Sequence, residues 1–305
     1  MNATTEQRII PPPLRRGDTI GIFAPAGPVT DGGKGAEAGL GLLHEAGFKT
    51  RLQTGLTGRR QGYLAGDDQE RTRELHDLWR DPEIKALLAL RGGYGCLRLL
   101  ERLDWGLLAG PRKMVIGFSD LTILHTAMQR HAGLVTLHGP MLSTLAGNDR
   151  ESIHSFFQAL GGEWPAVVRP AGLEILRFGR ARGPLIGGNL TCLSHLPGTG
   201  WEPPLDGAIL LLEDVGEAPY RLDRALTHLA LAGWLQRVAA IILGSFKDCG
   251  AVEEVWQRTM ELTANRPIPI WANFPSGHGR RNLTLPLGAE ADLDSEQRSL
   301  SFYGR

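Results

Sequence analysis

The chain has 305 residues, of which 42% are hydrophobic and 22% charged, which is ordinary for a globular protein but too long for one typical core. Its 33 Lys and Arg residues balance its 33 Asp and Glu residues, so no net charge attracts nucleic acid or a membrane surface. The three cysteines, Cys96, Cys192 and Cys249, lack the C-x-x-C spacing of a zinc or redox site and indicate reduced, buried thiols. No segment approaches the length of a membrane span, and residues 1–16 lack the apolar region of a signal peptide. We therefore expect two domains, a cytoplasmic location, and no nucleic-acid or membrane partner.

The first part of the chain alternates between predicted strands and predicted helices. Apolar, β-rich runs predict strands at residues 19–24, 48–52, 84–90, 114–117 and 135–140. Helical spacing of apolar residues predicts helices at residues 40–46, 70–80, 96–103, from 121 onward, and 151–160. This alternation predicts a mostly parallel sheet flanked by helices, and we assign residues 1–160 to one α/β domain.

The character of the chain changes after residue 160. Several glycines and two X-Pro pairs predict a linker over residues 161–182. In residues 183–305 the patterns predict strands at 208–212, 238–243, 283–287 and 300–303, helices at 220–234 and 252–265, and a short helix opening at residues 187–190. The predicted fold class is α/β, with a C-terminal β-rich α/β domain following the N-terminal one.

Ser119 lies at the corner of a predicted strand–turn–helix unit. Val115 and Ile116 suit a buried strand, and Leu121 and Leu124 begin the apolar face of a helix. A serine on such a corner can be a nucleophile, because its hydroxyl stands clear of the strand at the positive end of the helix. The alternative is a simple helix N-cap, a role in which serine is common. The pattern G-x-S-x-G is also incomplete, with Leu121 at its second glycine, so this stretch alone favours the cap.

A second glycine-rich turn, Arg91-Gly92-Gly93-Tyr94-Gly95, follows the predicted strand 84–90. It has three interpretations: a tight βα turn, a dinucleotide-binding loop, or an oxyanion loop that serves Ser119. The dinucleotide interpretation is weak, because the G-x-G-x-x-G spacing is absent and the turn is not in the first βα unit. The oxyanion interpretation gains support because turns after neighbouring parallel strands open at the same edge of a sheet.

A nucleophilic serine needs a histidine base, and that base needs a carboxylate to orient it. His278 stands between Gly277 and Gly279 on a predicted loop, where packing gives little reason for a histidine. Glu213 follows the predicted strand 208–212, and the order Ser, Glu, His matches that of α/β-hydrolases. The rival base is His138, and the rival carboxylates are Asp214 and Glu217.

These residues together resemble the cytoplasmic L,D-carboxypeptidases of peptidoglycan recycling and the related microcin C self-immunity peptidases. The resemblance covers nearly the whole chain, in the order of the family, through Arg91-Gly92-Gly93-Tyr94-Gly95, Gly117-Phe118-Ser119-Asp120, Gly187-Gly188-Asn189-Leu190, Leu212-Glu213-Asp214 and Gly277-His278-Gly279. No additional segment favours the longer immunity type.

The resemblance implies a serine peptidase whose triad is completed between two domains, usually in a homodimer. It implies Ser119 as nucleophile, His278 as base and then acid, Glu213 as its orienting partner, and the N–H groups of Gly93 and Asp120 as the oxyanion hole. Asn189 is similar to a residue that contacts the substrate. The implied reaction releases the terminal D-alanine from murein tetrapeptide through an acyl-enzyme, without a cofactor.

Two other classes of protein remain as alternatives. A thiol enzyme would use Cys96, which also follows a glycine turn, although no neighbouring base is apparent. A noncatalytic binding protein would use the glycine turns to hold a small anion or a peptide. No H-E-x-x-H motif or closely spaced cluster of histidine and acidic residues indicates a metal site.

Overall fold

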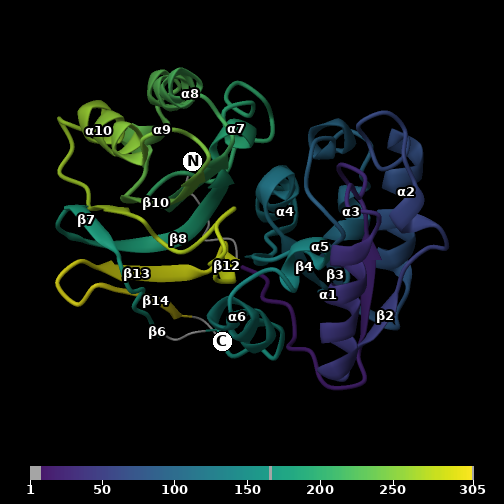
Figure 1. The fold of residues 1–305 in the computed structure, drawn as a ribbon. Coiled ribbons are helices and arrows are strands. Elements are labelled where there is room, and N and C mark those ends of the chain that lie inside the picture. The colour runs from purple at the N-terminus through teal and green to yellow at the C-terminus, as the bar shows by residue number, and fades with distance from the viewer. Residues whose placement is uncertain (1–7, 165–166, 304–305) are drawn as a thin grey trace.

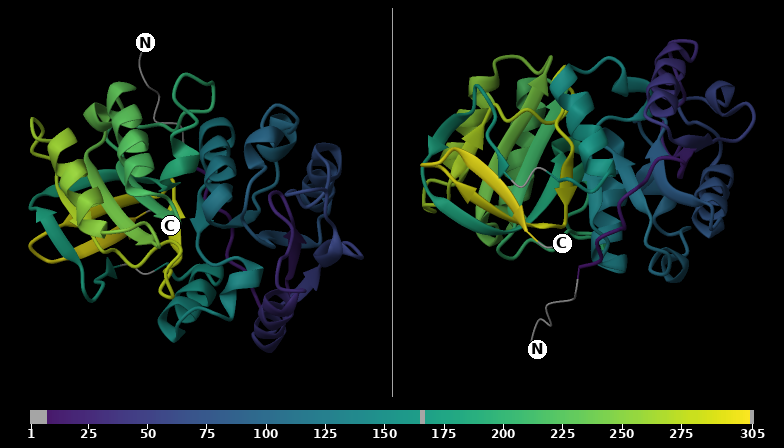
Figure 2. Two further views of the ribbon diagram at one scale, coloured as in Figure 1. Left: turned by 45° about the horizontal axis from the view of Figure 1, so that its top comes forward. Right: turned by 90° about the horizontal axis from the view of Figure 1, so that it is seen from below.

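The computed structural model describes residues 8–164 and 167–303, and these form two lobes that lie side by side (Figure 1). We call residues 8–160 the N-terminal half and the described residues from 161 to 303 the C-terminal half. Two further views keep the same arrangement, with the C-terminal strands and helices on one side and the first helices on the other (Figure 2). Residues 1–7, 165–166 and 304–305 of the predicted domains and linker lie outside the described part.

The first sheet has the strand order β12-β5-β4-β3-β1-β2 in the described chain. Its strands are β1 Thr19–Phe23, β2 Lys49–Arg51, β3 Ile84–Ala89, β4 Met114–Gly117, β5 Thr136–His138 and β12 Leu285–Leu287. Strands β1 to β5 are parallel, and β12 pairs antiparallel with β5. Ile22 and Phe23, adjacent in β1, belong to core clusters on opposite faces, which explains why these strands read as continuous apolar runs.

Helices cover both faces of this sheet. The cluster containing Ile22 holds residues of α1 Lys34–Glu45, α5 Leu142–Leu145 and α6 Arg150–Leu160. The cluster containing Phe23 holds residues of α2 Asp68–Arg80, α3 Trp105–Leu108 and α4 Thr122–Ala132. Three short 3₁₀ helices complete this half: η1 Leu56–Gly58, η2 Cys96–Leu99 and η3 Ser119–Leu121. Asp67 and Glu70 form a capping box that fixes the start of α2.

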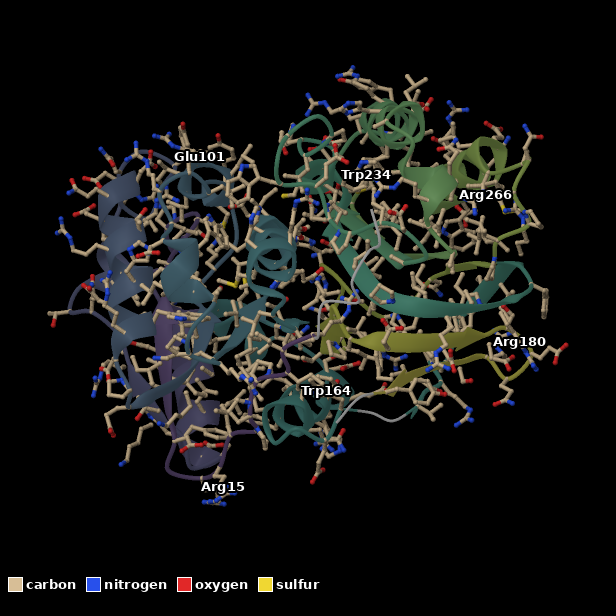
Figure 3. All side chains as sticks on the ribbon, turned by 180° about the vertical axis from the view of Figure 1, so that it is seen from behind. Arg15, Glu101, Trp164, Arg180, Trp234 and Arg266 are labelled. Atoms are coloured by element: carbon tan, nitrogen blue, oxygen red, sulfur yellow. The ribbon has the colours of Figure 1, made fainter. Side chains whose placement is uncertain are left out.

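The second sheet has the strand order β6-β14-β13-β8-β9-β10-β11-β7. Its strands are β6 Val167–Val168, β7 Glu174–Arg177, β8 Arg180–Asn189, β9 Ile209–Val215, β10 Ala240–Lys247, β11 Ile270–Ala272, β13 Glu290–Asp294 and β14 Ser299–Tyr303. Strands β8 to β11 are parallel, and the outer pairings are antiparallel. The helices of this half are α7 Leu190–Leu193, α8 Pro219–Leu231, α9 Trp234–Arg237 and α10 Val252–Leu262. Trp234 is fully buried in this half, and Arg180 marks its outer end (Figure 3).

One hydrophobic cluster runs across the seam between the halves. It joins Leu124 of α4 with Leu190 of α7 and Leu212 of β9, all fully buried. The backbone of Asn189 donates a hydrogen bond of 2.9 Å to the Thr122 hydroxyl across the same seam. The halves therefore pack as one body around this seam. The predicted fold class, a mostly parallel sheet flanked by helices plus a β-rich α/β half, is confirmed.

The segment 161–182, predicted as a linker, contains structured strands instead. It contributes β6, β7 and the first residues of β8 to the second sheet. These strands pair with β14, β11, β9 and β13, which lie far away in the sequence, so local composition did not reveal them. The domain boundaries themselves stay a prediction.

Several predicted elements end elsewhere in the structure. Strand β9 continues past residue 212 through Glu213 and Asp214, because β8 and β10 pair with it on both sides. Gly187 and Gly188 lie in β8 rather than in a helix; a Cβ on Gly188 would come within 2.4 Å of the Thr122 hydroxyl. The helix predicted over 96–103 is only η2, after which the Asp104 side chain caps the separate helix α3.

Candidate active site

Ser119 occupies a strained corner between β4 and η3. Its backbone has φ 64°, a left-handed conformation that costs a non-glycine residue roughly 1–2 kcal/mol. The N-cap residues of η3 and α4 are Phe118 and Leu121, and neither makes a side-chain cap. Ser119 is therefore not a helix cap, and its hydroxyl is directed elsewhere. His125 of α4 braces the corner by donating from Nε2 to the Gly117 carbonyl at 2.9 Å.

His278 lies between Ser119 of the N-terminal half and Glu213 of the C-terminal half and is hydrogen-bonded to both. The distance from Ser119 Oγ to His278 Nε2 is 3.1 Å, and His278 Nδ1 lies 2.6 Å from Glu213 Oε2. A carboxylate only accepts, so Nδ1 carries the proton and Nε2 is free to accept from the serine. The imidazole also packs on the Phe118 ring, with centroids 4.7 Å apart. The three groups thus form one continuous hydrogen-bonded chain.

Gly277 permits the close approach of His278 to Glu213. Its φ is 112°, and a Cβ at this position would come within 2.5 Å of Glu213 Oε2. The Gly277 N–H donates to Asn282 Oδ1 at 2.9 Å, which holds the loop in place. The glycine before the histidine, which drew attention in the sequence, is therefore required by sterics and not only by loop flexibility.

Glu213 is fully buried within β9. Burial raises the pKa of Glu213, and the His278 ring beside it opposes that rise. The rival Asp214, next in the strand, instead accepts hydrogen bonds from Asn189 Nδ2 at 3.0 Å and from the Thr191 hydroxyl at 2.8 Å. The rival Glu217 pairs with Arg221 at 3.4 Å. Of the three candidate carboxylates, Glu213 is the one hydrogen-bonded to His278.

The rival base His138 lies in β5 and is fully buried. Burial lowers the pKa of His138 to about 3, and neither ring nitrogen has a hydrogen-bond partner in the described part of the chain. Its nearest aromatic contact is the Phe118 ring, at 5.9 Å between centroids. The Ser119 hydroxyl is hydrogen-bonded to His278 instead, so the fully buried, neutral imidazole of His138 is a packing residue here.

The glycine turn after β3 lies directly against Ser119. A Cβ on Gly92 would sit 2.9 Å from Ser119 Cβ and 3.0 Å from its hydroxyl oxygen. Gly93 and Asp120 line a cavity of about 200 Å³ together with Ser119. The buried Asp120 carboxylate accepts from the Cys96 N–H at 2.8 Å, which ties the start of η2 to the corner that carries Ser119. The sequence did not single out Gly92 from its neighbours, because only the fold shows which glycine touches the serine.

Asn189 lines the same cavity from the C-terminal half. Its side-chain oxygen caps α7 by accepting from the Cys192 N–H at 3.0 Å, while its side-chain nitrogen donates to Asp214. The amide is thereby fixed in one orientation at the cavity wall. Asn189, at the end of β8, thus lies in the wall of the cavity that Ser119 also lines.

The thiol alternative receives no support from the position of Cys96. Its side chain is fully buried, and burial raises the pKa of the thiol well above its usual value. A reactive cysteine needs a lowered pKa and access to solvent. Among the described residues, no group of three or more His, Cys, Asp and Glu side chains is arranged to hold a metal ion. None of the described helices is long and apolar enough to cross a membrane.

The fold and site define a two-lobed α/β protein in which a serine, a histidine and a glutamate are linked across the seam. Comparison with known families extends this description. The chain belongs to the LD-carboxypeptidase family: the N-terminal domain of that family matches residues 20–139, and the C-terminal domain matches residues 182–293. It is therefore a carboxypeptidase, a hydrolase of the serine-peptidase type.

Relatives of known name agree with this assignment. The chain is 36% identical to the probable murein peptide carboxypeptidase of Bacillus subtilis over 95% of this chain and 92% of that one. It is 39% identical to the murein tetrapeptide carboxypeptidase of Pseudomonas aeruginosa over 78% of this chain and 81% of that one. Over 95% of its length it is also 30% identical to the Escherichia coli microcin C7 self-immunity protein MccF, of which 94% is covered.

Solved structures show the same fold. MccF in complex with glutamyl sulfamoyl guanosine superposes with a TM-score of 0.88 at 28% identity, covering 97% of this chain and 98% of that one. The muramoyltetrapeptide carboxypeptidase from Oxalobacter formigenes superposes with a TM-score of 0.79 at 30% identity, covering 93% and 97%. The chain is thus similar, over 93–97% of its length, to the solved structures of a muramoyltetrapeptide carboxypeptidase and of a self-immunity protein.

Proposed function

We propose that this chain is a serine L,D-carboxypeptidase that releases the terminal D-alanine from murein tetrapeptide during peptidoglycan recycling. The observation that carries the proposal is the hydrogen-bonded chain from the Ser119 hydroxyl through His278 to Glu213, with distances of 3.1 and 2.6 Å. The named relatives that act on murein peptides support the choice of substrate.

In the proposed reaction, Ser119 Oγ attacks the carbonyl carbon of the third residue while His278 Nε2 takes its proton. The resulting imidazolium is stabilised by the Glu213 carboxylate through Nδ1–H. The N–H groups of Gly93 and Asp120 bind the developing oxyanion, each worth about 10²–10³ in rate. His278 then gives its proton to the departing amine, so D-alanine leaves and an acyl-Ser119 ester remains. Water, deprotonated by His278, hydrolyses the ester.

The burial of Glu213 suits this role. A carboxylate shielded from water interacts strongly with a neighbouring charge, so it stabilises the imidazolium more than an exposed one does. His278, whose side chain is 17% exposed, remains open toward the cavity and the serine.

The alternative substrate is a toxic peptide–nucleotide conjugate, as the similarity to MccF implies. The charge of the cavity disfavours it. Asp120, Asp214 and Glu217 line the cavity, and no described lysine or arginine does. A phosphate group would meet three carboxylates, and His195 is the one residue of the described wall that can carry a positive charge. The same repulsion disfavours a noncatalytic protein that holds a small anion.

Release of D-alanine from murein tetrapeptide in the presence of a chelator tests the proposal. We expect turnover by the wild-type chain and a loss of about 10⁶-fold in kcat for Ser119→Ala. The matched control is Ser194→Ala, because the Ser194 hydroxyl bonds only the Thr191 carbonyl in the described structure. Activity that persists in Ser119→Ala, or that the chelator alone removes, would end the serine mechanism.

The homodimer implied by the family resemblance stays a prediction, and so do the cytoplasmic location and the independence from cofactors. Light scattering of the purified chain tests the first, with twice the chain mass of 33.2 kDa as the expected result. Cell fractionation tests the second. The chelator arm of the activity assay tests the third for metal ions.

A further inference from the structure

The charged residues that line the cavity beside Ser119 are mostly acidic. Three carboxylates line it, those of Asp120, Asp214 and Glu217, and His195 is the one residue of the described wall that can carry a positive charge. A concave site lined by one sign of charge concentrates ligands of the opposite sign. The wall therefore favours a substrate that brings a cationic group into the cavity.

Two of the three carboxylates are already committed to protein donors. Asp214 is 2% exposed; its Oδ1 accepts from Asn189 Nδ2 and the Val215 N–H, and its Oδ2 accepts from the Thr191 N–H and hydroxyl. Asp120 is 4% exposed and accepts from the Cys96 N–H. The four acceptor sites of Asp214 are filled, so a ligand there would have to break buried hydrogen bonds. Asp120 is almost completely covered, so it presents little surface to a ligand.

Glu217 differs from both. It stands in the loop between β9 and α8, one residue after Gly216, which has φ 69°. Its side chain is 23% exposed, and within the described structure it pairs with Arg221, whose Nη1 lies 3.4 Å from Glu217 Oε2. The Arg221 side chain is 58% exposed, so it can turn into solvent without losing a buried contact. Such a surface pair contributes little, and a ligand cation can replace the arginine at small cost.

The tetrapeptide itself limits which of its groups can be that cation. Its terminal D-alanine carries a carboxylate, and its second residue, D-glutamate, carries another. Once the N-terminal amine is acylated, the side chain of the third residue is the remaining position that can bear an ammonium. This is the residue whose carbonyl Ser119 would attack, so its side chain enters the cavity next to the serine.

We propose that Glu217 is a specificity residue that binds the side-chain ammonium of the third residue, so that the enzyme selects a dibasic amino acid at this position. The inference rests on the proposed function, because it assumes that the tetrapeptide is the substrate. Arg221 holds the carboxylate in place when the cavity is empty and yields it to the ammonium.

Two N-acetylated tetrapeptides test this selection: one with L-lysine as third residue, and one with L-norleucine, which has the same chain length without the ammonium. We expect the wild-type chain to have a kcat/KM about tenfold or more higher for the lysine peptide, as a charge-assisted hydrogen bond provides. Glu217→Gln should bring the ratio close to one by lowering the lysine value alone. Glu217→Lys should reverse the preference.

Turnover of the norleucine peptide serves as the internal measure that each variant folds and keeps its catalytic groups. Glu253→Gln is the matched control, since Glu253 is an exposed glutamate in the first turn of α10 and should leave the ratio unchanged. The wild-type ratio should also fall between about 0.01 M and about 1 M salt, as the Debye length shortens from about 30 to about 3 Å.

The outcomes separate this inference from the proposed function. If the wild-type chain cleaves both peptides at equal rates, or if Glu217→Gln lowers both rates together, Glu217 does not select the ammonium and the carboxypeptidase proposal stands. If the wild-type chain cleaves neither peptide, the proposed function fails and this inference fails with it.

Discussion

The two halves of the molecule bring their polar groups to the seam in different ways. In the N-terminal half, Ser119 is placed by its own backbone, in a left-handed conformation between β4 and η3. In the C-terminal half, Glu213 is placed by the pairing of β9 with two neighbouring strands and is buried completely. The nucleophile depends on a few adjacent residues, whereas its acid–base partners depend on contacts far apart in the sequence.

This difference explains how the site can be both strained and stable. The cost of the Ser119 conformation is local and of order 1–2 kcal/mol, and packing at the seam between the halves offsets it. The Glu213–His278 pair needs no backbone strain at Glu213 itself, but it needs exclusion of water. The N-terminal half therefore contributes a strained corner that carries the serine, and the C-terminal half contributes a buried carboxylate. The hydrogen bond between Ser119 and His278 joins the two.

The largest difference is expected between the neighbours Glu213 and Asp214. Glu213→Gln should lower kcat by about 10³–10⁴-fold, because His278 loses the charge that stabilises its protonated form. Asp214→Asn should leave kcat within about tenfold but destabilise the fold by about 1–3 kcal/mol, because an amide nitrogen would face the Thr191 donors. Steady-state kinetics and chemical unfolding of both variants measure the contrast. Equal losses of kcat would contradict the assignment.

A smaller effect is expected from the glycine turn that touches the serine. Gly92→Ala would place a methyl group 2.9 Å from Ser119 Cβ, and the displaced hydroxyl should lose about 10² in kcat. Gly58→Ala is the matched control, since nothing lies within 4 Å of its added Cβ and its φ is not positive. A Gly92→Ala enzyme with wild-type kcat would show that the turn does not position the nucleophile.

A buried histidine of the N-terminal half, His138, should make the stability of the fold depend on pH. His138, buried without a hydrogen-bond partner among the described residues, has a pKa lowered to about 3, while an unfolded histidine titrates at about 6.5. The unfolded chain therefore binds more protons below that pH, so stability present above about 6.5 is lost as pH falls toward about 3. His138→Gln should remove about 1.4 kcal/mol of this loss per pH unit below about 6.

Urea unfolding at several pH values measures this effect as the difference between the wild-type and His138→Gln curves. Buried Glu213 has a raised pKa, so its contribution has the opposite sign: it favours the fold below about pH 4.5 and is lost as pH rises. That contribution is the same in both chains and cancels in the difference. Parallel curves would mean that His138 is hydrated or paired in solution.

The smallest effect is expected at Cys96. Cys96→Ala should change kcat/KM by less than about twofold, because the thiol is fully buried and its pKa is raised. Thiol-alkylating reagents should leave the wild-type enzyme active. Rapid inactivation by such a reagent, slowed by murein tetrapeptide, would revive the thiol mechanism.

The sequence was most informative where a local pattern decides the structure. The strand at residues 84–90 follows from an apolar run, the helix at 70–80 from the helical spacing of its apolar residues, and the corner at Ser119 from a glycine–serine turn. They appear in the structure as β3, α2 and the turn after β4. The pairing of Ser119 with His278 was suggested by the order of residues and by the family resemblance, and spacing alone could not have supplied it.

What the sequence could not supply depends on long-range pairing. Strand β8 lies partly within a glycine-rich segment that was predicted as a linker, and its register is set by β9 and β13. Glu213 was expected at the end of a strand, yet it lies inside β9, because its pairing with Asn189 of β8 outweighs the low strand preference of its carboxylate. The choice of Glu213 over Asp214 and Glu217 likewise required the loop geometry of Gly277.

The central claim is that Ser119 and Glu213 act as one unit through His278, and the kinetics of the double variant test it most directly. If the claim holds, kcat for D-alanine release by Ser119→Ala/Glu213→Gln equals that of Ser119→Ala alone, because the carboxylate has no role once the nucleophile is gone. If the two losses multiply, the two residues act independently, and the serine and the glutamate do not form a common catalytic unit across the seam.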